Sequence, residues 1–469
     1  MKQSVLIVAG CLLVAGVRAQ VSSRLQTAFR QFEADPQLKH AISALYVIDA
    51  KTGEVVFDKN AQAGLAPAST QKIITSVTAF ELLGKGYQFK TYIGYDIGVS
   101  SGELPGNLYI EGFGDPTFGS WRWKTTTGDI VLKKITDILK QNGVQRIKGD
   151  IWFDDMRLGL QPVPDGWIWQ DIGNYYGAGC WGLNWNENQY NLVLRAGDVK
   201  DYPTEIITTK PVLTEYEISN RIRTGAAGSG DNAYIYYAPY SNRGFATGTI
   251  PAGEKNFTIA GSLPHPAKEF ARTLASQLKK ENITFSNRLK FYTDSVFASK
   301  GVRKATLIFD SIMSPSFDTI NYWFLQKSIN LYGEAFLRQV GWVNSYDGST
   351  KNGVEVVKNF WKQKGLDEDE LNISDGSGLS PQNRVTAHAQ VEILKYARNQ
   401  PWFQSFYNAL PEYNNMKMKS GTIKDVKAFC GYHKAKDGKE YIFSFLVNNY
   451  NGPASALVNK MYTVLNVLK

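Results

Sequence analysis

A serine and a lysine three positions apart, Ser69 and Lys72, are the first residues whose types and spacing could do chemistry. In a helix these positions share a face, so the lysine amine can reach the serine hydroxyl. A serine hydroxyl becomes an effective nucleophile when a neighbouring base accepts its proton, and a lysine with a lowered pKa can be that base. At a helix start, the Ser69 backbone N–H could also donate to an oxyanion. Ser276 and Lys279 repeat the spacing in the middle of an expected helix, where we expect no catalytic role.

A serine and an amide two positions apart, Ser328 and Asn330, are the second candidate. They lie just before an expected helix over 333–340, at a loop or helix end from which both side chains can point into one cleft. The serine could pass a proton, and the amide could hold a substrate carbonyl or the lysine amine. Taken alone, the pattern fits a helix cap equally well.

The third candidate is an expected strand that carries Lys419, Ser420, Gly421 and Thr422. Without a side chain at Gly421, an extended ligand could lie against the backbone and pair as an added strand. Lys419 and the Ser420 hydroxyl could hold a substrate carboxylate, and the Thr422 backbone N–H could donate to an oxyanion. Residues 51–53 also read Lys-Thr-Gly, but we interpret them as a hairpin turn.

The elements that must position these residues come from both ends of the sequence. Runs of β-type residues predict strands over 44–48, 54–57, 417–422, 427–432 and 440–447. Helical periodicity predicts helices over 24–32, 67–84, 267–280, 321–340, 354–364, 386–396 and 454–468. Between 87 and 293, short β-type runs alternate with loops rich in Gly, Pro, Asn and Trp. The sequence therefore predicts an α+β fold, an antiparallel sheet flanked by helices, with mostly β domains inserted after the Ser69 helix.

The ordered series S-x-x-K, S-x-N and K-[ST]-G is typical of serine enzymes that acylate on β-lactams and on D-alanyl-D-alanine peptides. By this series the chain resembles the low-molecular-mass class C penicillin-binding proteins, the D-alanyl-D-alanine carboxypeptidase/endopeptidase family. Other segments are similar to sequence boxes of that family: Pro67–Lys72, Gly112–Thr117, Gly149-Asp150 with Asp154, 176–188, Asp375–Ser380 and Gly421–Tyr432. The resemblance covers essentially the whole chain after its leader.

The resemblance implies a β-lactamase/transpeptidase-like catalytic domain with a five-stranded antiparallel sheet, over 20–88 and 300–469. It implies an inserted domain over 89–170 and 265–299, and a nested one over 171–264. The implied activity is that of a serine D-Ala-D-Ala carboxypeptidase, with endopeptidase cleavage of cross-links as a related outcome. It implies peptidoglycan stem peptides as substrate, penicillin as a covalent inhibitor, and neither cofactor nor metal. The alternatives are a serine β-lactamase and a non-catalytic cell-wall-binding protein.

The implied mechanism is acyl transfer through an acyl-enzyme. Ser69 attacks the carbonyl between two D-alanine residues, and Lys72 accepts its proton. Ser328 and Lys419 help to carry that proton to the leaving amine, while Asn330 orients the acyl chain and Lys72. Water then releases the acyl group.

The resemblance also implies an aspartate in the inserted domains that recognises the amino group of the stem peptide. Asp154 is the candidate, although a turn-forming role is the stronger expectation for it. We expect Asp115 and Asp375 to organise loops. Four tryptophans could stack on glycan sugars, but packing is the favoured interpretation for Trp167, Trp169, Trp181 and Trp185.

The overall composition is that of a folded globular protein, because 43% of the residues are hydrophobic and 20% are charged. The formal net charge of +9 comes from scattered basic residues without an arginine-rich stripe. We therefore expect no nucleic-acid partner. The four histidines show no metal-ligand spacing.

The first residues predict a secretory leader over 1–19, with basic Lys2, an apolar run over 5–17 and a small residue at its end. Lipid attachment at Cys11 is the alternative. We expect an exported protein, in the periplasm or on the cell-wall side of the cytoplasmic membrane, and peripheral membrane association stays open. Beyond the leader, Cys180 and Cys430 are either bridged or two buried thiols.

Overall fold

The computed structural model describes residues 20–469, so the predicted leader and Cys11 lie outside the described residues. The chain forms two compact units. The first contains the chain up to Leu82, Asn321–Ser328 and Val354–Lys469, and the second contains Leu83–Ile320 and Ile329–Gly353. Of the helices that the structure describes, none has the length and apolar character needed to cross a membrane.

The first unit is built on an antiparallel sheet with strand order β19-β20-β21-β22-β1-β2. Its strands are β1 (Ile42–Asp49), β2 (Val55–Lys59), β19 (Glu412–Tyr413), β20 (Met416–Ile423), β21 (Val426–Lys434) and β22 (Glu440–Asn448). The β1–β22 pairing, with Ile42 opposite Asn448, joins the two ends of the sequence as predicted. The prediction of five strands missed β19, a two-residue edge strand that is too short for an alternation signal.

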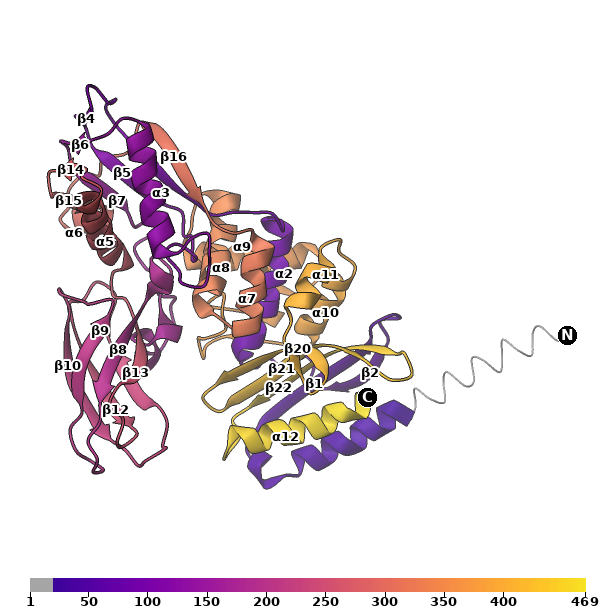
Figure 1. Cartoon of the computed structure of the whole chain (residues 1–469). Coiled ribbons are helices and arrows are strands. Elements are labelled where there is room, and N and C mark those ends of the chain that lie inside the picture. The colour runs from indigo at the N-terminus through magenta and orange to yellow at the C-terminus, as the bar shows by residue number, and fades with distance from the viewer. Residues whose placement is uncertain (1–19) are drawn as a thin grey trace. The chain divides into compact units, whose positions relative to one another are not determined.

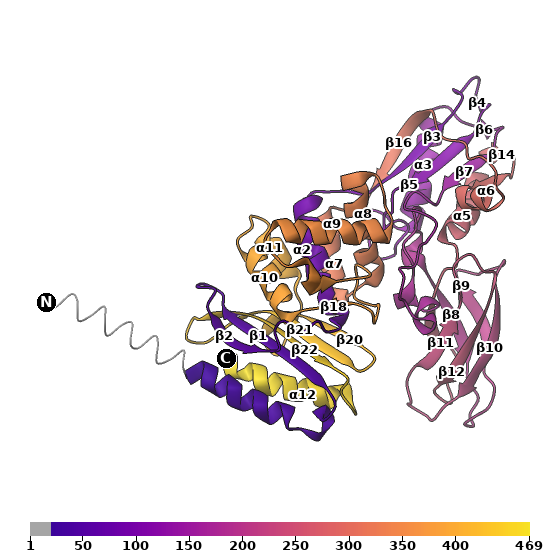
Figure 2. The ribbon, with the colours of Figure 1, turned by 180° about the vertical axis from the view of Figure 1, so that it is seen from behind.

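Helices cover both faces of this sheet (Figures 1 and 2). On one face lie the helix over 20–33 and α12 (Ala454–Leu465), whose apolar positions enter one hydrophobic core: Leu25, Phe29, Phe32, Leu457 and Met461. On the other face α10 (Ala387–Arg398) packs on β22 and β1, and α2 (Lys72–Leu82) packs on α10. Further elements of this unit are α11 (Phe403–Ala409), β17 (Leu371–Asn372) and β18 (Arg384–Val385).

Two predicted helices differ from the structure at the residues of interest. The chain enters the first through a 3-10 turn, Ala68–Gln71, and α2 itself begins at Lys72. The predicted helix over 321–340 is interrupted: α7 (Phe317–Lys327) ends, Ser328 takes a φ of 56°, and α8 (Asn330–Ser345) begins. The turn interpretation of 51–53 is confirmed, because the Asp49 carboxylate accepts from the backbone N–H groups of Lys51 and Thr52 at 2.9 and 3.0 Å.

The second unit contains a five-stranded mixed sheet with strand order β15-β7-β5-β3-β16. Its strands are β3 (Lys90–Tyr95), β5 (Leu108–Gly112), β7 (Ile151–Asp154), β15 (Leu289–Phe291) and β16 (Leu307–Met313). The helices α3 (Gly128–Gln141) and α5 (Pro266–Lys280) share its hydrophobic core through residues such as Ile135 and Phe270. A small parallel sheet adds β4 (Glu103–Leu104), β6 (Arg146–Ile147) and β14 (Thr284–Phe285).

Two three-stranded sheets share a further core in the second unit, which contains Leu192, Ile222 and Ile235. Their strands are β8 (Gln189–Arg195), β9 (Glu205–Lys210), β10 (Glu217–Thr224), β11 (Asn232–Tyr236), β12 (Arg243–Ile250) and β13 (Phe257–Ser262). The remaining helices are α4 (Trp169–Ile172), α6 (Tyr292–Phe297) and α9 (Thr350–Gln363), whose first residues belong to this unit.

The two cysteines of the described chain, Cys180 and Cys430, are both free and buried. Of the two alternatives drawn from the sequence, the structure therefore has the buried thiols. Burial raises the pKa of the Cys180 thiol to about 11, which keeps it in the unreactive thiol form at neutral pH.

Candidate active site

The predicted nucleophile and base lie in contact in the first unit. The Lys72 Nζ donates to the Ser69 Oγ at 3.1 Å and to the Ser377 carbonyl oxygen at 2.6 Å. Lys72 is completely buried, whereas Ser69 is only half-buried. A lysine held between two acceptors can direct a lone pair or a proton at one hydroxyl, and that hydroxyl stays open to a substrate.

The turn that presents Ser69 has an unfavourable backbone conformation. Ala68, just before the serine, has a φ of 46°, which costs a residue with a Cβ roughly 1–2 kcal/mol. Buried hydrogen bonds hold the turn: the Thr70 Oγ1 donates to the Pro67 carbonyl at 2.7 Å and accepts from the Gln390 Nε2 at 2.9 Å. Gln390 in turn accepts from the Ser444 Oγ on β22 at 2.7 Å, so the sheet and α10 together fix the nucleophile turn.

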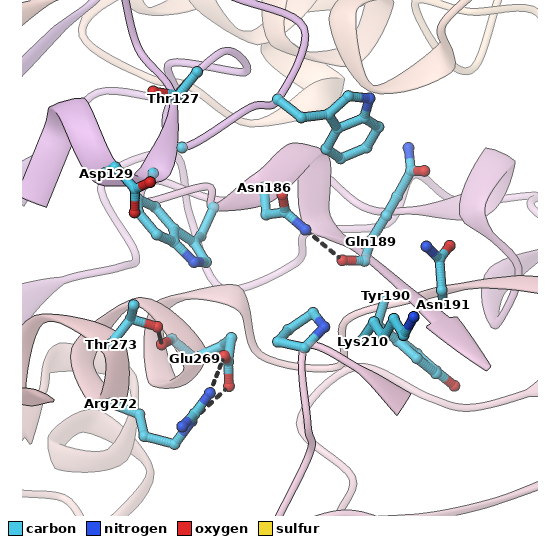
Figure 3. A pocket seen from close by; sticks show the side chains of 15 residues that line it. Thr127, Asp129, Asn186, Gln189, Tyr190, Asn191, Lys210, Glu269, Arg272 and Thr273 are labelled. Atoms are coloured by element: carbon cyan, nitrogen blue, oxygen red, sulfur yellow. Dashed lines mark hydrogen bonds and ion pairs between the residues drawn. The ribbon is translucent and has the colours of Figure 1, made fainter. Parts of the chain in front are cut away.

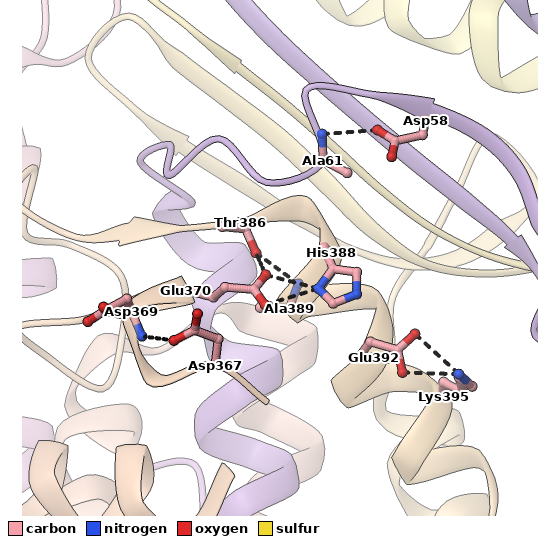
Figure 4. Close-up of polar contacts among 10 residues, drawn as sticks. All are labelled: Asp58, Ala61, Asp367, Asp369, Glu370, Thr386, His388, Ala389, Glu392 and Lys395. Atoms are coloured by element: carbon pink, nitrogen blue, oxygen red, sulfur yellow. Dashed lines mark hydrogen bonds and ion pairs between the residues drawn. The ribbon is translucent and has the colours of Figure 1, made fainter. Parts of the chain in front are cut away.

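Helix α10, which supplies Gln390, is itself fixed at its N-terminus (Figure 4). Thr386 caps the helix by accepting from the Ala389 backbone N–H at 2.9 Å. The Glu370 carboxylate accepts from the Thr386 hydroxyl and lies 2.9 Å from the His388 Nδ1. The hydrogen bond to Glu370 raises the pKa of His388, which favours the protonated imidazole and a charge-assisted contact between the two side chains.

The loop that holds Lys72 is organised by Asp375. Its carboxylate accepts from the backbone N–H groups of Gly378 at 2.8 Å and Ser380 at 2.7 Å, and from the Gln71 side chain at 3.0 Å. The loop-organising role expected for Asp375 is therefore confirmed. Gly378, at a φ of 81°, packs so closely on this turn that an added Cβ would lie 1.9 Å from the Ala68 carbonyl oxygen.

Sequence reasoning missed the Ser377 carbonyl as a partner of Lys72. The resemblance included the box Asp375–Ser380, but no role for its backbone followed from side-chain types. The available signal was the two glycines that flank Ser377, since such a loop allows close approach of backbone to a neighbour.

Strand β20 brings the third candidate motif against the nucleophile turn. A Cβ added at Gly421 would lie 2.6 Å from the Pro67 carbonyl oxygen and 2.9 Å from the Ser69 backbone nitrogen. The absence of a side chain at Gly421 thus allows the Ser69 turn to pack directly against β20, in addition to the ligand access that the sequence predicts.

Lys419 lies on the same face of β20 as Gly421 and is 1% exposed. Its Nζ donates to the Ser420 carbonyl oxygen at 2.7 Å. Burial lowers the pKa of Lys419 to about 7, so near neutral pH the amine exists in both protonation states.

The outer edge of β20 is open beyond its first residues. In the first unit as described, β19 pairs only with Met416 and Lys417. A two-residue loop joins Ile423 to Val426, the last residue pair of the β20–β21 hairpin. Because hydrogen bonding between antiparallel strands alternates from one residue pair to the next, the Thr422 N–H points away from β21. This edge can therefore accept an extended ligand, with the Thr422 N–H directed toward it.

We expect Gly421→Ala to lower the rate of acylation by penicillin about a hundredfold, because the new methyl group pushes on the backbone of the Ser69 turn. The overpacking should cost about 1–3 kcal/mol of stability, so the protein should stay folded. Gly86→Ala is the matched control, because nothing lies within 4 Å of the Cβ that it adds. Stopped-flow acylation and thermal unfolding measure the two effects. An unchanged acylation rate would contradict the role of Gly421 in positioning the Ser69 turn.

Ser328 lies at the break after α7, with a positive φ of 56°, and is half-buried. Helix α7 is joined to α2 by a buried hydrogen bond from the Ser76 Oγ to the Asn321 Oδ1, at 2.7 Å. The Phe324 ring of α7 has its centroid 5.7 Å from the Lys72 Nζ. The helix that precedes Ser328 is thus anchored to the helix that carries Lys72, while the proton-transfer role of Ser328 stays a prediction.

The other two predicted site residues, Asn330 and Asp154, belong to the second unit. The Asn330 Nδ2 donates to the Tyr176 carbonyl oxygen at 2.8 Å. Asp154 ends β7 and lies 3.2 Å from the Arg157 Nε, and burial raises the pKa of its carboxyl to about 6. Their proposed contacts with a substrate stay predictions. Asp115 organises its loop as expected, by accepting from the Thr117 N–H and hydroxyl at 2.8 and 2.7 Å.

Comparison with known proteins gives a family match over nearly the whole chain. The model of the D-Ala-D-Ala carboxypeptidase 3 (S13) family matches residues 25–466. A D-alanyl-D-alanine carboxypeptidase of an Actinomadura species is 26% identical over 458 residues, which is 92% of this chain and 82% of that protein. The D-alanyl-D-alanine carboxypeptidase DacB of Haemophilus influenzae is 23% identical over 420 residues, 85% of this chain and 83% of that protein.

Solved structures show the same fold. The crystal structure of penicillin binding protein 4 from Haemophilus influenzae superimposes with a TM-score of 0.78 at 19% identity, covering 91% of this chain and 96% of that one. A second structure of that protein, complexed with a β-lactam, gives a TM-score of 0.74 at 18% identity and covers 95% and 98% of the two chains. The α+β fold with inserted domains, predicted from the sequence, is confirmed.

Proposed function

Because the chain belongs to the D-Ala-D-Ala carboxypeptidase 3 (S13) family, we propose that Ser69 is the nucleophile with which it hydrolyses the D-alanyl-D-alanine ends of peptidoglycan stem peptides. The observation that carries this assignment is the 3.1 Å contact between the buried Lys72 amine and the half-exposed Ser69 hydroxyl. In this assignment the chain is a serine-type carboxypeptidase whose nucleophile, Ser69, and base, Lys72, lie three residues apart in the sequence.

Acylation begins when the Ser69 Oγ attacks the carbonyl carbon between the two D-alanines. The proton of the hydroxyl passes to the Lys72 amine, and negative charge develops on the carbonyl oxygen. The backbone N–H groups of Ser69 and Thr422 stabilise that oxyanion. Hydrogen-bond donors that are already in position stabilise negative charge as it develops in the transition state. The alignment of β20 against the Ser69 turn supports this pairing of donors.

The acyl-enzyme forms when the C–N bond breaks and the leaving D-alanine amine takes up a proton. That proton comes from the Lys72 ammonium by way of Ser328 and Lys419, and Asn330 orients the acyl chain. Lys419 and the Ser420 hydroxyl hold the terminal carboxylate of the substrate. A pKa of about 7 suits Lys419 to both tasks, since it can bind the anion as a cation and exchange a proton near neutral pH. Hydrolysis of the ester on Ser69 then regenerates the enzyme.

Penicillin is expected to acylate the same serine and to remain bound. The Haemophilus influenzae relative was solved in complex with a β-lactam, which supports this expectation. The Asp375 carboxylate, on the loop next to Lys72, already accepts several hydrogen bonds and is poorly suited to activate a deacylating water.

We also propose that the protein is exported to the periplasm or the cell-wall side of the membrane. Asp154 is proposed to recognise the stem-peptide amino group.

Labelled penicillin with intact-mass analysis tests the proposed function. We expect one adduct per chain that persists for many minutes, together with release of D-alanine from a D-alanyl-D-alanine peptide. Rapid turnover of penicillin without an adduct would instead indicate a serine β-lactamase, and neither adduct nor D-alanine release would indicate a non-catalytic cell-wall-binding protein. Comparing a linear pentapeptide with a cross-linked dimer as substrate separates carboxypeptidase from endopeptidase preference.

A further inference from the structure

A cavity of about 700 Å³ opens in the second unit, among residues to which the proposed chemistry gives no role. Figure 3 shows its walls: the start of α3 with Thr127 and Asp129, the side of α5 with Glu269 and Arg272, and the beginning of β8 with Gln189. Its volume is within the range of ligand sites, roughly 300–1,000 Å³.

The charges that line this cavity balance one another. Glu269 is buried and forms a bidentate ion pair with Arg272, whose Nη2 and Nε donate to the carboxylate oxygens at 2.5 and 3.0 Å. Asp129 and Lys210 add one negative and one positive charge. The remaining polar lining consists of three side-chain amides and three hydroxyl groups, which can both donate and accept hydrogen bonds. Such a lining favours a neutral ligand rich in hydroxyl and amide groups over an anion or a cation.

An exposed indole completes the cavity. Trp121 is 53% exposed, and the Arg122 guanidinium lies 5.7 Å from its ring centroid. A second indole, that of Trp185, is 5% exposed and forms part of the lining. It fits there because Gly119 has no side chain: an added Cβ would lie 2.3 Å from the Trp185 ring. An indole open to solvent beside amide groups is a suitable surface for the apolar face of a sugar ring.

The turn between Trp185 and Gln189 is held in a costly conformation. Asn186, Glu187 and Asn188 all have positive φ, between 50° and 54°. The buried Glu187 carboxylate compensates by accepting from the Ser120 hydroxyl at 2.7 Å, and it forms an ion pair with Arg122 at 2.9 Å.

The same contacts that maintain this turn place useful groups at the cavity. They fix Arg122 beside the exposed Trp121, and they position Asn186 and Gln189 in the lining. Strain that is maintained by several buried contacts is characteristic of functional sites.

We propose that this cavity binds the glycan strand of peptidoglycan, a chain of N-acetylated amino sugars. Its lactyl carboxyl groups form amide bonds and therefore carry no charge. The ligand class follows from the neutral, amide-rich lining and the exposed indole, while its identity as peptidoglycan rests on the proposed function. The protein would thus hold the polymer at one place and act on its peptide at another.

Titration calorimetry of the full chain with a tetramer of N-acetylglucosamine tests this proposal. We expect saturable binding, and a loss of affinity of about tenfold or more in Trp121→Ala, because the stacking surface is removed. Trp169→Ala is the matched control, since Trp169 is 48% exposed in the same unit but does not line the cavity. Its affinity should equal that of the unmodified protein.

Two outcomes would overturn the glycan site: no binding of the tetramer at millimolar concentration, or equal affinity in the Trp121→Ala and Trp169→Ala variants. A Ser69→Ala variant separates this proposal from the catalytic one. It should bind the tetramer normally while forming no penicillin adduct, and Trp121→Ala should form the adduct at the normal rate. Failure of either assay therefore identifies which of the two proposals is wrong.

Discussion

Replacing Ser69 by alanine should eliminate the penicillin adduct and lower the release of D-alanine by at least roughly 10³-fold. Removing the nucleophile of a serine hydrolase removes the whole covalent route, and only the modest effect of binding and oxyanion donors is left. Because Ser69 is half-buried and its side chain does not support the turn, which is held through Thr70, the variant should fold normally.

The chain contains its own matched control for this experiment. Ser276 and Lys279 have the same spacing in α5, but the Ser276 hydroxyl donates to the Arg272 carbonyl one turn earlier, at 3.1 Å. Ser276→Ala should therefore retain the full adduct and full activity. The assay is intact-mass analysis after incubation with penicillin, followed by measurement of D-alanine release. An adduct that still forms in Ser69→Ala would exclude Ser69 as the nucleophile.

The contrast between these two serines shows what the sequence could predict. Local spacing was the same for both pairs, and only the position of each serine in its helix separated them. That position was readable, because Ser69 lies at the start of the helix predicted over 67–84, whereas the helical pattern around 276 is uninterrupted. The strands that flank the site were predicted for the same reason, since their alternation and turns are local.

The backbone that positions the site could not be predicted in this way. Ala68 and Ser328 have positive φ, although neither is a residue type that indicates it. Each conformation is imposed by its surroundings; for Ala68, the Thr70–Gln390–Ser444 hydrogen bonds join residues far apart in the sequence. The Ser377 carbonyl that binds Lys72 is likewise a backbone atom, and its position depends on the Asp375 loop. Periodicity reports on side-chain environment and carries no information on such contacts.

Lys419 shows a conflict between stability and function that the motif did not suggest. Burial lowers the pKa of Lys419 from the ordinary 10.5 to about 7, which means that the folded protein resists protonation of this amine. Between about pH 7 and 10.5 the unfolded chain binds the extra proton and the folded chain does not. The free energy of unfolding should therefore rise with pH across that interval, and the full cost of burying the lysine is present below pH 7.

Replacing Lys419 by methionine should remove this cost. We expect Lys419→Met to be more stable than the unmodified protein by up to roughly 5 kcal/mol below pH 7, since each pKa unit corresponds to about 1.36 kcal/mol. The advantage should shrink as the pH rises toward 10.5. Urea unfolding at pH 6, 8 and 10 measures it. Lys417→Met, on the same strand but at a half-buried position, is the control and should bring no comparable gain in stability.

The same substitution should impair catalysis, because the cation that holds the substrate carboxylate is lost. We expect kcat/KM for penicillin acylation to fall by roughly 10²–10³-fold, the cost of removing a charge-assisted hydrogen bond to a buried anion. In the unmodified enzyme, kcat/KM should decline as the pH rises through about 7, because it reports the protonation state of the free enzyme. A substrate whose carboxylate is replaced by a neutral amide should lack that decline. A variant that lost activity without gaining stability would show that Lys419 is charged at little cost in the folded protein, and the proton-exchange role would then be untenable.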